Sequence, residues 1–163
     1  VSVNRASLLG EKNKGWGTIE KVLQWGAIGK CAEMSGGGQS VLDMTVEYAK
    51  QRTQFGRPIG SFQAIQHHCA NMATDVEGSK FITYQAAWRL SEGLPSEREV
   101  AMAKAWVSEA YRRVCALGHQ SHGAIGFTKE HNMQLYSRRA KAAEIVFGDS
   151  NYHLEKVAEE IGL

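Results

Sequence analysis

The sequence has few cysteines, few prolines and no long hydrophobic run. Its three cysteines, Cys31, Cys69 and Cys115, lie far apart and form no C-x-x-C pair, so we expect core thiols rather than a disulfide framework or a zinc site. No apolar stretch approaches the roughly 18 residues that a membrane-spanning helix needs, and no charged and then apolar leader opens the chain. The sequence therefore predicts a soluble, cytoplasmic protein without membrane insertion.

An excess of one charge is also missing. The 163 residues carry 19 Lys and Arg against 17 Asp and Glu, which gives a formal net charge of +2 at pH 7. This balance gives no reason to expect nucleic acid or an anionic membrane as the main partner, and it is typical of solvated helix faces. The length suits one domain with a buried core.

Apolar residues recur at helical spacing along most of the chain. The first such pattern predicts a helix from about Thr18 to Gln51, with the stretch SGGGQS (35–40) in its middle. Three glycines in a helix cost about 1 kcal/mol each relative to alanine. Either a neighbouring helix or a ligand approaches these glycines closely, or the helix breaks there.

Two further long helices follow. One is predicted to begin with Ser61 as its N-cap and to run to about Gly93, and the next to open with the capping box Ser96-Glu97-Arg98-Glu99. Each carries an apolar stripe with spacings of three and four: Phe62, Ile65, Cys69, Met72 and Val76 in the first, and Val100, Ala103, Val107, Ala110, Val114 and Leu117 in the second. Such stripes predict antiparallel neighbours packed at a shallow angle.

The remaining sequence predicts a Gly-rich loop over 118–128, a helix from about Asn132 to Val146, and a last helix from about Ser150 to Ile161, capped by Asp149 or Ser150. Strand signals are almost absent after residue 10. We therefore expect an all-α fold, an up-and-down four-helix bundle with a short additional C-terminal helix. Residues 1–15 are expected to be the end of a preceding β-domain or a linker, residues 16–163 the helical domain, and the chain a fragment of a longer protein.

Several kinds of site are excluded by their patterns. A di-iron bundle needs Glu-x-x-His on two helices, which the chain lacks, and its six histidines provide no converging set of ligands, so no metal is expected. His131 and His153 are interpreted as surface or capping residues. The string around Ser121 lacks the first glycine of a nucleophile elbow, and the GGG run is not a dinucleotide-binding fingerprint.

Two polar loops remain, and the first, QRTQFGRPIGSFQ (51–63), is unusual for a helix connection. It combines glycines, which let a ligand approach the backbone, with Arg52 and Arg57, whose guanidinium groups suit phosphate oxygens. Phe55 could stack on a flat ring. The residues therefore favour a phosphate-bearing, partly aromatic ligand, with ordinary helix connections as the alternative.

Two longer stretches, YAKQRTQFGRPIGSFQAIQ (48–66) and GHQSHGAIGFTKEHNMQLYSRRAKAAEI (118–145), strongly resemble the C-terminal α-helical domain of the acyl-CoA dehydrogenase family. The opening SLLGEKNKGW is similar to the family's exit from its middle β-domain. This resemblance implies an FAD cofactor, an acyl-CoA thioester desaturated between its α and β carbons, electron transfer to an electron-transfer flavoprotein, and a homo- or hetero-tetramer.

The resemblance also assigns cofactor residues. In the family the R-x-x-F-G loop of one subunit reaches the FAD of a neighbouring subunit, so Arg52 would meet the pyrophosphate. Ala124 replaces a usual glycine, and Asp149 replaces a usual threonine and could simply cap the last helix. The complete set of implied FAD contacts is Arg52, Gln54, Phe55, Ile59, Phe62, Gln63 and Ile65 in the first loop, Gln120, Gly123 and Ala124 for the ADP half, and Asp149 and Asn151 near the adenosine.

The catalytic residue of the family is missing. The usual glutamate lies in a Y-E-G-T string, and the matching position in RRAKAAEIVFGDS is Phe147. Some members place the base on the first long helix, where this chain has Gly26, followed by Ala27 in place of an arginine that contacts CoA. Glu33 lies two turns beyond Gly26 on the same helical face and is a candidate base or substrate contact, with an ordinary helix-face glutamate as the alternative.

Four functions stay open for this sequence. The first is an acyl-CoA dehydrogenase, inactive as a fragment, whose partner subunit supplies the base in a heteromeric enzyme. The second is a catalytically silent flavin-binding or assembly subunit. The third is a flavin monooxygenase or oxidase on the same fold, and the fourth is a purely structural bundle.

Overall fold

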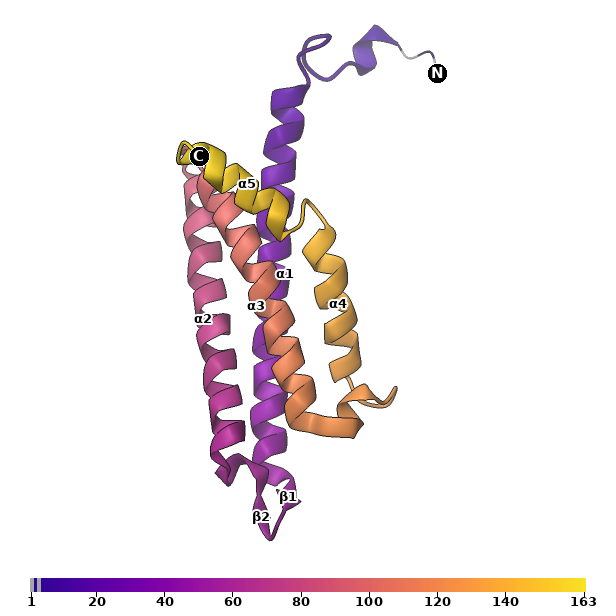
Figure 1. Cartoon of the computed structure of the whole chain (residues 1–163). Helices are drawn as coiled ribbons and strands as arrows, with labels where there is room; N and C mark the ends of the chain where they lie inside the picture. Colours follow the sequence, from indigo (N-terminus) through magenta and orange to yellow (C-terminus); the bar gives the residue numbers. More distant parts are fainter. Residues whose placement is uncertain (1, 3) are drawn as a thin grey trace.

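The computed structural model describes residue 2 and residues 4–163, and its architecture is all-α. Three long helices, α1 (Trp16–Gln51), α2 (Gln63–Ser91) and α3 (Glu97–His122), run side by side, and α3 contacts each of the other four helices. Helix α4 (Met133–Ile145) lies along α1 and α3, and α5 (Ser150–Glu160) crosses one end of α3 (Figure 1). The predicted all-α bundle with a short C-terminal helix is confirmed.

Short elements connect these helices. A two-stranded antiparallel hairpin, β1 (Thr53–Gln54) and β2 (Arg57–Pro58), and the 3-10 helix η2 (Ile59–Ser61) join α1 to α2. A second 3-10 helix, η3 (Gly123–Phe127), follows α3, and η1 (Arg5–Ser7) precedes the bundle. The exposed segment before α1 extends away from the bundle (Figure 1). That residues 1–15 end a preceding domain stays a prediction, and residues 1 and 3 lie outside the described residues.

Helix α1 runs without interruption through the three glycines, so the alternative of a break there is wrong. A Cβ built on Gly37 would lie 2.5 Å from the Tyr111 hydroxyl oxygen, and one on Gly38 would lie 3.4 Å from Val76. Gly36 faces open space. Two of the three glycines therefore let α2 and α3 approach α1 closely, and the packing they permit offsets their low helix propensity.

The core lies between α1, α2 and α3, as the predicted stripes require. The stripe of α3 is buried from Val100 to Val114, whereas that of α2 is buried only at Met72 and Val76. Cys31 and Cys115 belong to this core, and burial raises the pKa of each thiol to about 12. Cys69 is half-buried at the edge of the core.

The helix ends differ from the prediction in three places. Helix α3 continues to His122, so residues 118–122 are helical rather than part of a loop. Helix α2 begins after Phe62, because Ser61 belongs to η2 and its hydroxyl donates to the Pro58 carbonyl oxygen. Ser96 does precede α3, yet no capping box forms, since Glu99 pairs with Arg89 and Arg98 instead.

Candidate functional site

The hairpin after α1 has a strained tip. Phe55 and Gly56 both adopt positive φ, +54° and +77°, which is the backbone of a type I′ two-residue turn. A non-glycine aromatic residue with positive φ is uncommon and disfavoured. Phe55 is also 92% exposed, and only the edge of its ring meets Phe62, at 6.1 Å between centroids. The hairpin thus presents an aromatic ring to the outside of this chain.

The two arginines of the hairpin differ in their contacts. The Arg57 guanidinium lies over the Phe62 ring, 4.2 Å from its centroid. Arg52 ends α1, and its backbone N–H donates to the Tyr48 carbonyl oxygen at 2.8 Å. Within the described part of the chain, the Arg52 guanidinium makes no hydrogen bond or ion pair. Arg52 is therefore the arginine available to a phosphate group.

The second predicted loop lies at the same end of the bundle as the hairpin (Figure 1). Helix α3 ends at Gly123, whose φ of +65° suits glycine, and Gln120 and Ala124 are exposed. His122 stacks on Tyr48 in the last turn of α1, with 4.5 Å between ring centroids. This stacking joins the two loops, and it brings most of the predicted cofactor residues to one end.

Asp149 and Asn151 lie at the other end. Gly148 accepts a hydrogen bond from Lys104 near the start of α3, and Gln120 lies more than four turns further along that helix, which corresponds to about 24 Å. The Asp149 side chain accepts a hydrogen bond from the Tyr152 backbone N–H at 2.9 Å, so it caps α5. One chain therefore does not bring the two groups of predicted cofactor residues together.

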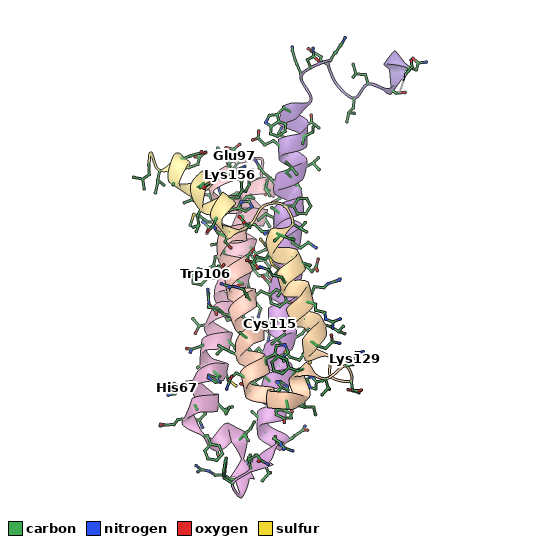
Figure 2. The ribbon with its side chains drawn as sticks, turned by 45° about the vertical axis from the view of Figure 1, so that its right-hand side comes forward. His67, Glu97, Trp106, Cys115, Lys129 and Lys156 are labelled. Carbon is green, nitrogen blue, oxygen red and sulfur yellow. The ribbon has the colours of Figure 1, made fainter. Side chains whose placement is uncertain are left out.

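A cavity of about 390 Å³ lies beside this second group, between the start of α1, the first turn of α3 and the α4–α5 connection. Figure 2 shows Glu97 and Lys156 at this end of the bundle. Its lining combines aromatic, aliphatic and charged side chains: Trp16, Glu20, Leu23, Gln24, Ala27, Glu97, Val100, Ala101, Phe147, Gly148, Tyr152, His153 and Lys156. Such a mixed lining suits a ligand with an apolar body and a few polar groups.

The two positions at which a base is missing lie against each other, and one of them, Phe147, lines this cavity. A Cβ built on Gly26 would lie only 2.6 Å from two ring carbons of Phe147. Phe147 adopts a φ of +63°, and Gly148 one of +97°. The ring of Phe147 thus occupies the space that a side chain at position 26 would need.

His153 holds the Phe147 turn, which we define as residues 144–148. The prediction of a surface position for His153 is wrong, because this residue is 4% exposed. Its Nε2–H donates to the Phe147 carbonyl oxygen at 2.8 Å, and its Nδ1 has no partner among the described residues. Burial lowers the pKa of His153, which favours the neutral ring. His131 does cap, since its Nδ1 accepts from the Met133 N–H.

Glu33 lies away from the cavity, about 10 Å along α1 from Gly26. It pairs with Lys30 at 2.6 Å and with Arg139 at 3.0 Å, and it lines a separate groove between α1 and α4. The hydrogen bond from Lys30 lowers the pKa of Glu33, which makes it a weaker base. This placement fits a helix-face glutamate.

The sequence interpretation missed Lys104, which the structure buries completely on α3. The sequence does contain an indication of this burial. Ala101, Ala105, Ser108 and Cys115 form a second stripe of small residues on the same helix, and a lysine within a buried stripe must have buried hydrogen-bond partners. The cavity residues Glu20 and Glu97 were missed too, since only tertiary packing brings them together.

Among residue 2 and residues 4–163, no group of three or more His, Cys, Asp or Glu side chains is arranged to hold a metal ion. None of the helices in this described part combines the length and the apolar character needed to cross a membrane.

Comparison with known proteins defines the family. Residues 13–162 match the family model for the acyl-CoA dehydrogenase C-terminal domain. A 3-(aryl)acrylate reductase of Clostridium sporogenes is 36% identical over 161 residues, covering 99% of this chain and 43% of that protein. The caffeyl-CoA reductase-Etf complex subunit CarC of Acetobacterium woodii is 37% identical over 150 residues, covering 92% of this chain and 40% of that protein.

A solved structure agrees with these relatives. Butyryl-CoA dehydrogenase from Megasphaera elsdenii superposes with a TM-score of 0.95 at 32% identity, covering 98% of this chain and 42% of that one. This chain is therefore a C-terminal helical domain of the acyl-CoA dehydrogenase family. It spans about two fifths of the length of the proteins it matches.

Proposed function

We propose that this chain is the FAD-binding and assembly domain of a flavoprotein that desaturates an acyl-CoA thioester between its α and β carbons. Electrons would pass to an electron-transfer flavoprotein, a partner class that the name of the Acetobacterium woodii relative also contains. The assembly would be a homo- or hetero-tetramer, and its expected location is the cytoplasm.

The observation that carries this proposal is the contact between Gly26 and Phe147 beside the cavity. The family resemblance assigned the usual base to position 147 and the alternative base to position 26, although the two lie far apart in the sequence. In the fold their atoms would be 2.6 Å apart if position 26 carried a Cβ. Phe147 lines the cavity, as does Ala27, the neighbour of Gly26, and this cavity is the expected location of the α carbon.

The residues at the hairpin end suit a flavin nucleotide. Arg52 offers an unpaired guanidinium for the diphosphate, Phe55 offers an exposed ring, and Gly123 leaves open space around its backbone. When bound, a flavin would be the acceptor of the hydride that leaves the β carbon. The hairpin begins at Arg52, 25 residues beyond the cavity residue Ala27 along α1, which corresponds to about 38 Å. Each chain would therefore hold the cofactor of a neighbour with its hairpin and face its own cofactor with its cavity.

Proton removal is the step that this chain does not supply at the usual positions. A base must lie within hydrogen-bond reach of the α proton, and neither phenylalanine nor glycine can accept a proton. We therefore infer that a partner subunit provides the base. The same observation favours the second candidate function, a catalytically silent flavin-binding subunit.

The test is made on the full-length protein, purified alone and together with the product of its genomic neighbour. CoA thioesters are screened for bleaching of the flavin absorbance. Bleaching only in the presence of the partner supports the heteromeric enzyme, and turnover by the chain alone rules out the silent subunit. Absence of bound flavin from both preparations would overturn the proposed function.

Two variants sharpen this test. Phe147→Glu introduces a carboxylate at the cavity, and it should accelerate flavin reduction by the full-length chain alone, since general bases contribute about 10²–10⁴-fold. Glu33→Gln is the control and should leave the rate unchanged. A large loss in the Glu33 variant would instead assign the base to Glu33.

A further inference from the structure

The completely buried Lys104 lies next to the candidate site and has no role in the proposed chemistry. Its side chain rises from α3 and is 0% exposed. Its Nζ donates to the Ser108 hydroxyl oxygen at 3.1 Å, to the Glu144 carbonyl oxygen at 2.9 Å and to the Gly148 carbonyl oxygen at 2.8 Å. An ammonium group has three donors, so the surroundings satisfy all of them.

Two of these acceptors bracket Phe147. Glu144 belongs to the last turn of α4, where carbonyl groups lack intrahelical partners, and Gly148 follows Phe147 directly. Lys104 therefore caps α4 from the side and fixes both ends of the Phe147 turn. His153 fixes the carbonyl group between them.

Burial of a lysine costs free energy that burial of an apolar side chain does not. Burial lowers the pKa of Lys104, which reflects the loss of water around the ammonium group. Methionine or leucine would fill a similar volume without that loss. The feature that an apolar side chain cannot reproduce is the pair of hydrogen bonds to the turn.

The turn needs such support because its backbone is strained. Phe147 has a φ of +63°, which L-residues other than glycine, asparagine and aspartate rarely adopt, and its ring is only partly buried. Without the two hydrogen bonds, relaxation of φ would swing the ring away from Gly26. That movement would open the wall of the cavity.

We propose that Lys104 is a positioning residue: it holds the Phe147 turn so that the ring closes on Gly26 and sets the shape of the cavity. Its effect on the ring follows from the structure alone. That the shape of the cavity determines which acyl-CoA thioester binds rests on the proposed function.

The experiment uses full-length protein labelled with 4-fluorophenylalanine. The fluorine resonance that disappears in Phe147→Leu belongs to Phe147. In Lys104→Met this resonance should shift or broaden, whereas the other fluorine resonances stay in place, which a general loss of stability would not produce. Lys80→Met is the matched control, because Lys80 also links two helices, α2 and α1, through its hydrogen bond to Gln39, but lies away from the turn.

An unchanged Phe147 resonance in Lys104→Met would overturn the proposal. If the methionine variant fails to fold, Lys104→Gln replaces it, since its amide can still donate to one of the two carbonyl groups. The glutamine variant should shift the Phe147 resonance by a smaller amount, and no shift in it would again contradict the proposal.

A second readout measures the cavity itself. Binding of butyryl-CoA and 3-phenylpropionyl-CoA is followed by the change in flavin absorbance. The ratio of the two dissociation constants should change at least fivefold in Lys104→Met and should not change in Lys80→Met. An unchanged ratio would refute the control of cavity shape. If the unaltered protein binds neither thioester, the proposed function fails, while the fluorine result still decides the role of Lys104.

Discussion

The contact between Gly26 and Phe147 makes a quantitative prediction about two glycines of the same helix. Gly26 and Gly29 lie one turn apart in α1, and alanine at either position should gain about 1 kcal/mol of helix propensity. A Cβ at Gly29 meets nothing within 4 Å, so Gly29→Ala should stabilise the chain by that amount. Gly26→Ala gains the same propensity but must also displace the ring of Phe147.

The cost of that displacement follows from the distances. A Cβ at Gly26 would lie 2.6 Å from Cε1 and Cζ of Phe147, whereas carbon atoms pack at about 3.5–4.0 Å, so the ring must move by about 1 Å. Overpacking costs about 1–3 kcal/mol, and a ring that is 38% exposed has room to turn outward. We therefore expect a cost of about 1–2 kcal/mol, which makes Gly26→Ala less stable than Gly29→Ala by that amount.

Denaturant unfolding of the 163-residue chain measures this difference, provided that the two variants share one m-value. Phe147→Ala removes the ring, and in that background Gly26→Ala should stabilise the chain as much as Gly29→Ala does. The expected coupling energy between positions 26 and 147 is therefore about 1–2 kcal/mol. Equal stabilisation by both alanine substitutions while Phe147 is present would refute the contact.

Three further predictions concern the glycine run, pH and the hairpin. Gly36→Ala should stabilise the chain by about 1 kcal/mol, whereas Gly37→Ala, whose Cβ would collide with a buried tyrosine, should be less stable than Gly36→Ala by about 1–3 kcal/mol in the same unfolding assay. Burial lowers the pKa of His153, as it does for His119 and His122, so the unfolded state binds more protons than the folded state and stability should fall as the pH drops below about 6.5. His153 should contribute up to about 1.4 kcal/mol per pH unit to this fall, and His153→Gln should remove that contribution. In full-length protein, Arg52→Met should raise the dissociation constant of the flavin, measured by loss of bound flavin on dilution, at least tenfold, and Arg57→Met should raise it less than threefold. Equal increases would contradict the difference between the contacts of the two arginines.

The two ends of the bundle have different chemical roles in the proposed assembly. The hairpin end offers an unpaired guanidinium and an exposed ring to the outside of the chain, while the other end encloses a cavity. In the proposed assembly a single chain therefore completes neither the cofactor site nor the substrate site.

The sequence by itself determined the helices, their order and the core stripe of α3. Local periodicity settles these features, because a helix buries the residues that recur at spacings of three and four. It also singled out Arg52 and Phe55, which lie within one short connection, and the family resemblance singled out Phe147. The glycine run was ambiguous from the sequence, since nothing local indicates that Tyr111 fills the space beside Gly37.

Only the tertiary structure decided which distant residues meet. Phe147, the neighbour of Gly26, and the two carbonyl partners of Lys104 lie forty or more positions away in the sequence, and no periodicity within one segment encodes such a pairing. His153 was predicted at the surface for the same reason, because a polar side chain at a helix start is buried only when another element covers it. Helix formation depends on neighbours in sequence, whereas the cavity and its supports depend on neighbours in space.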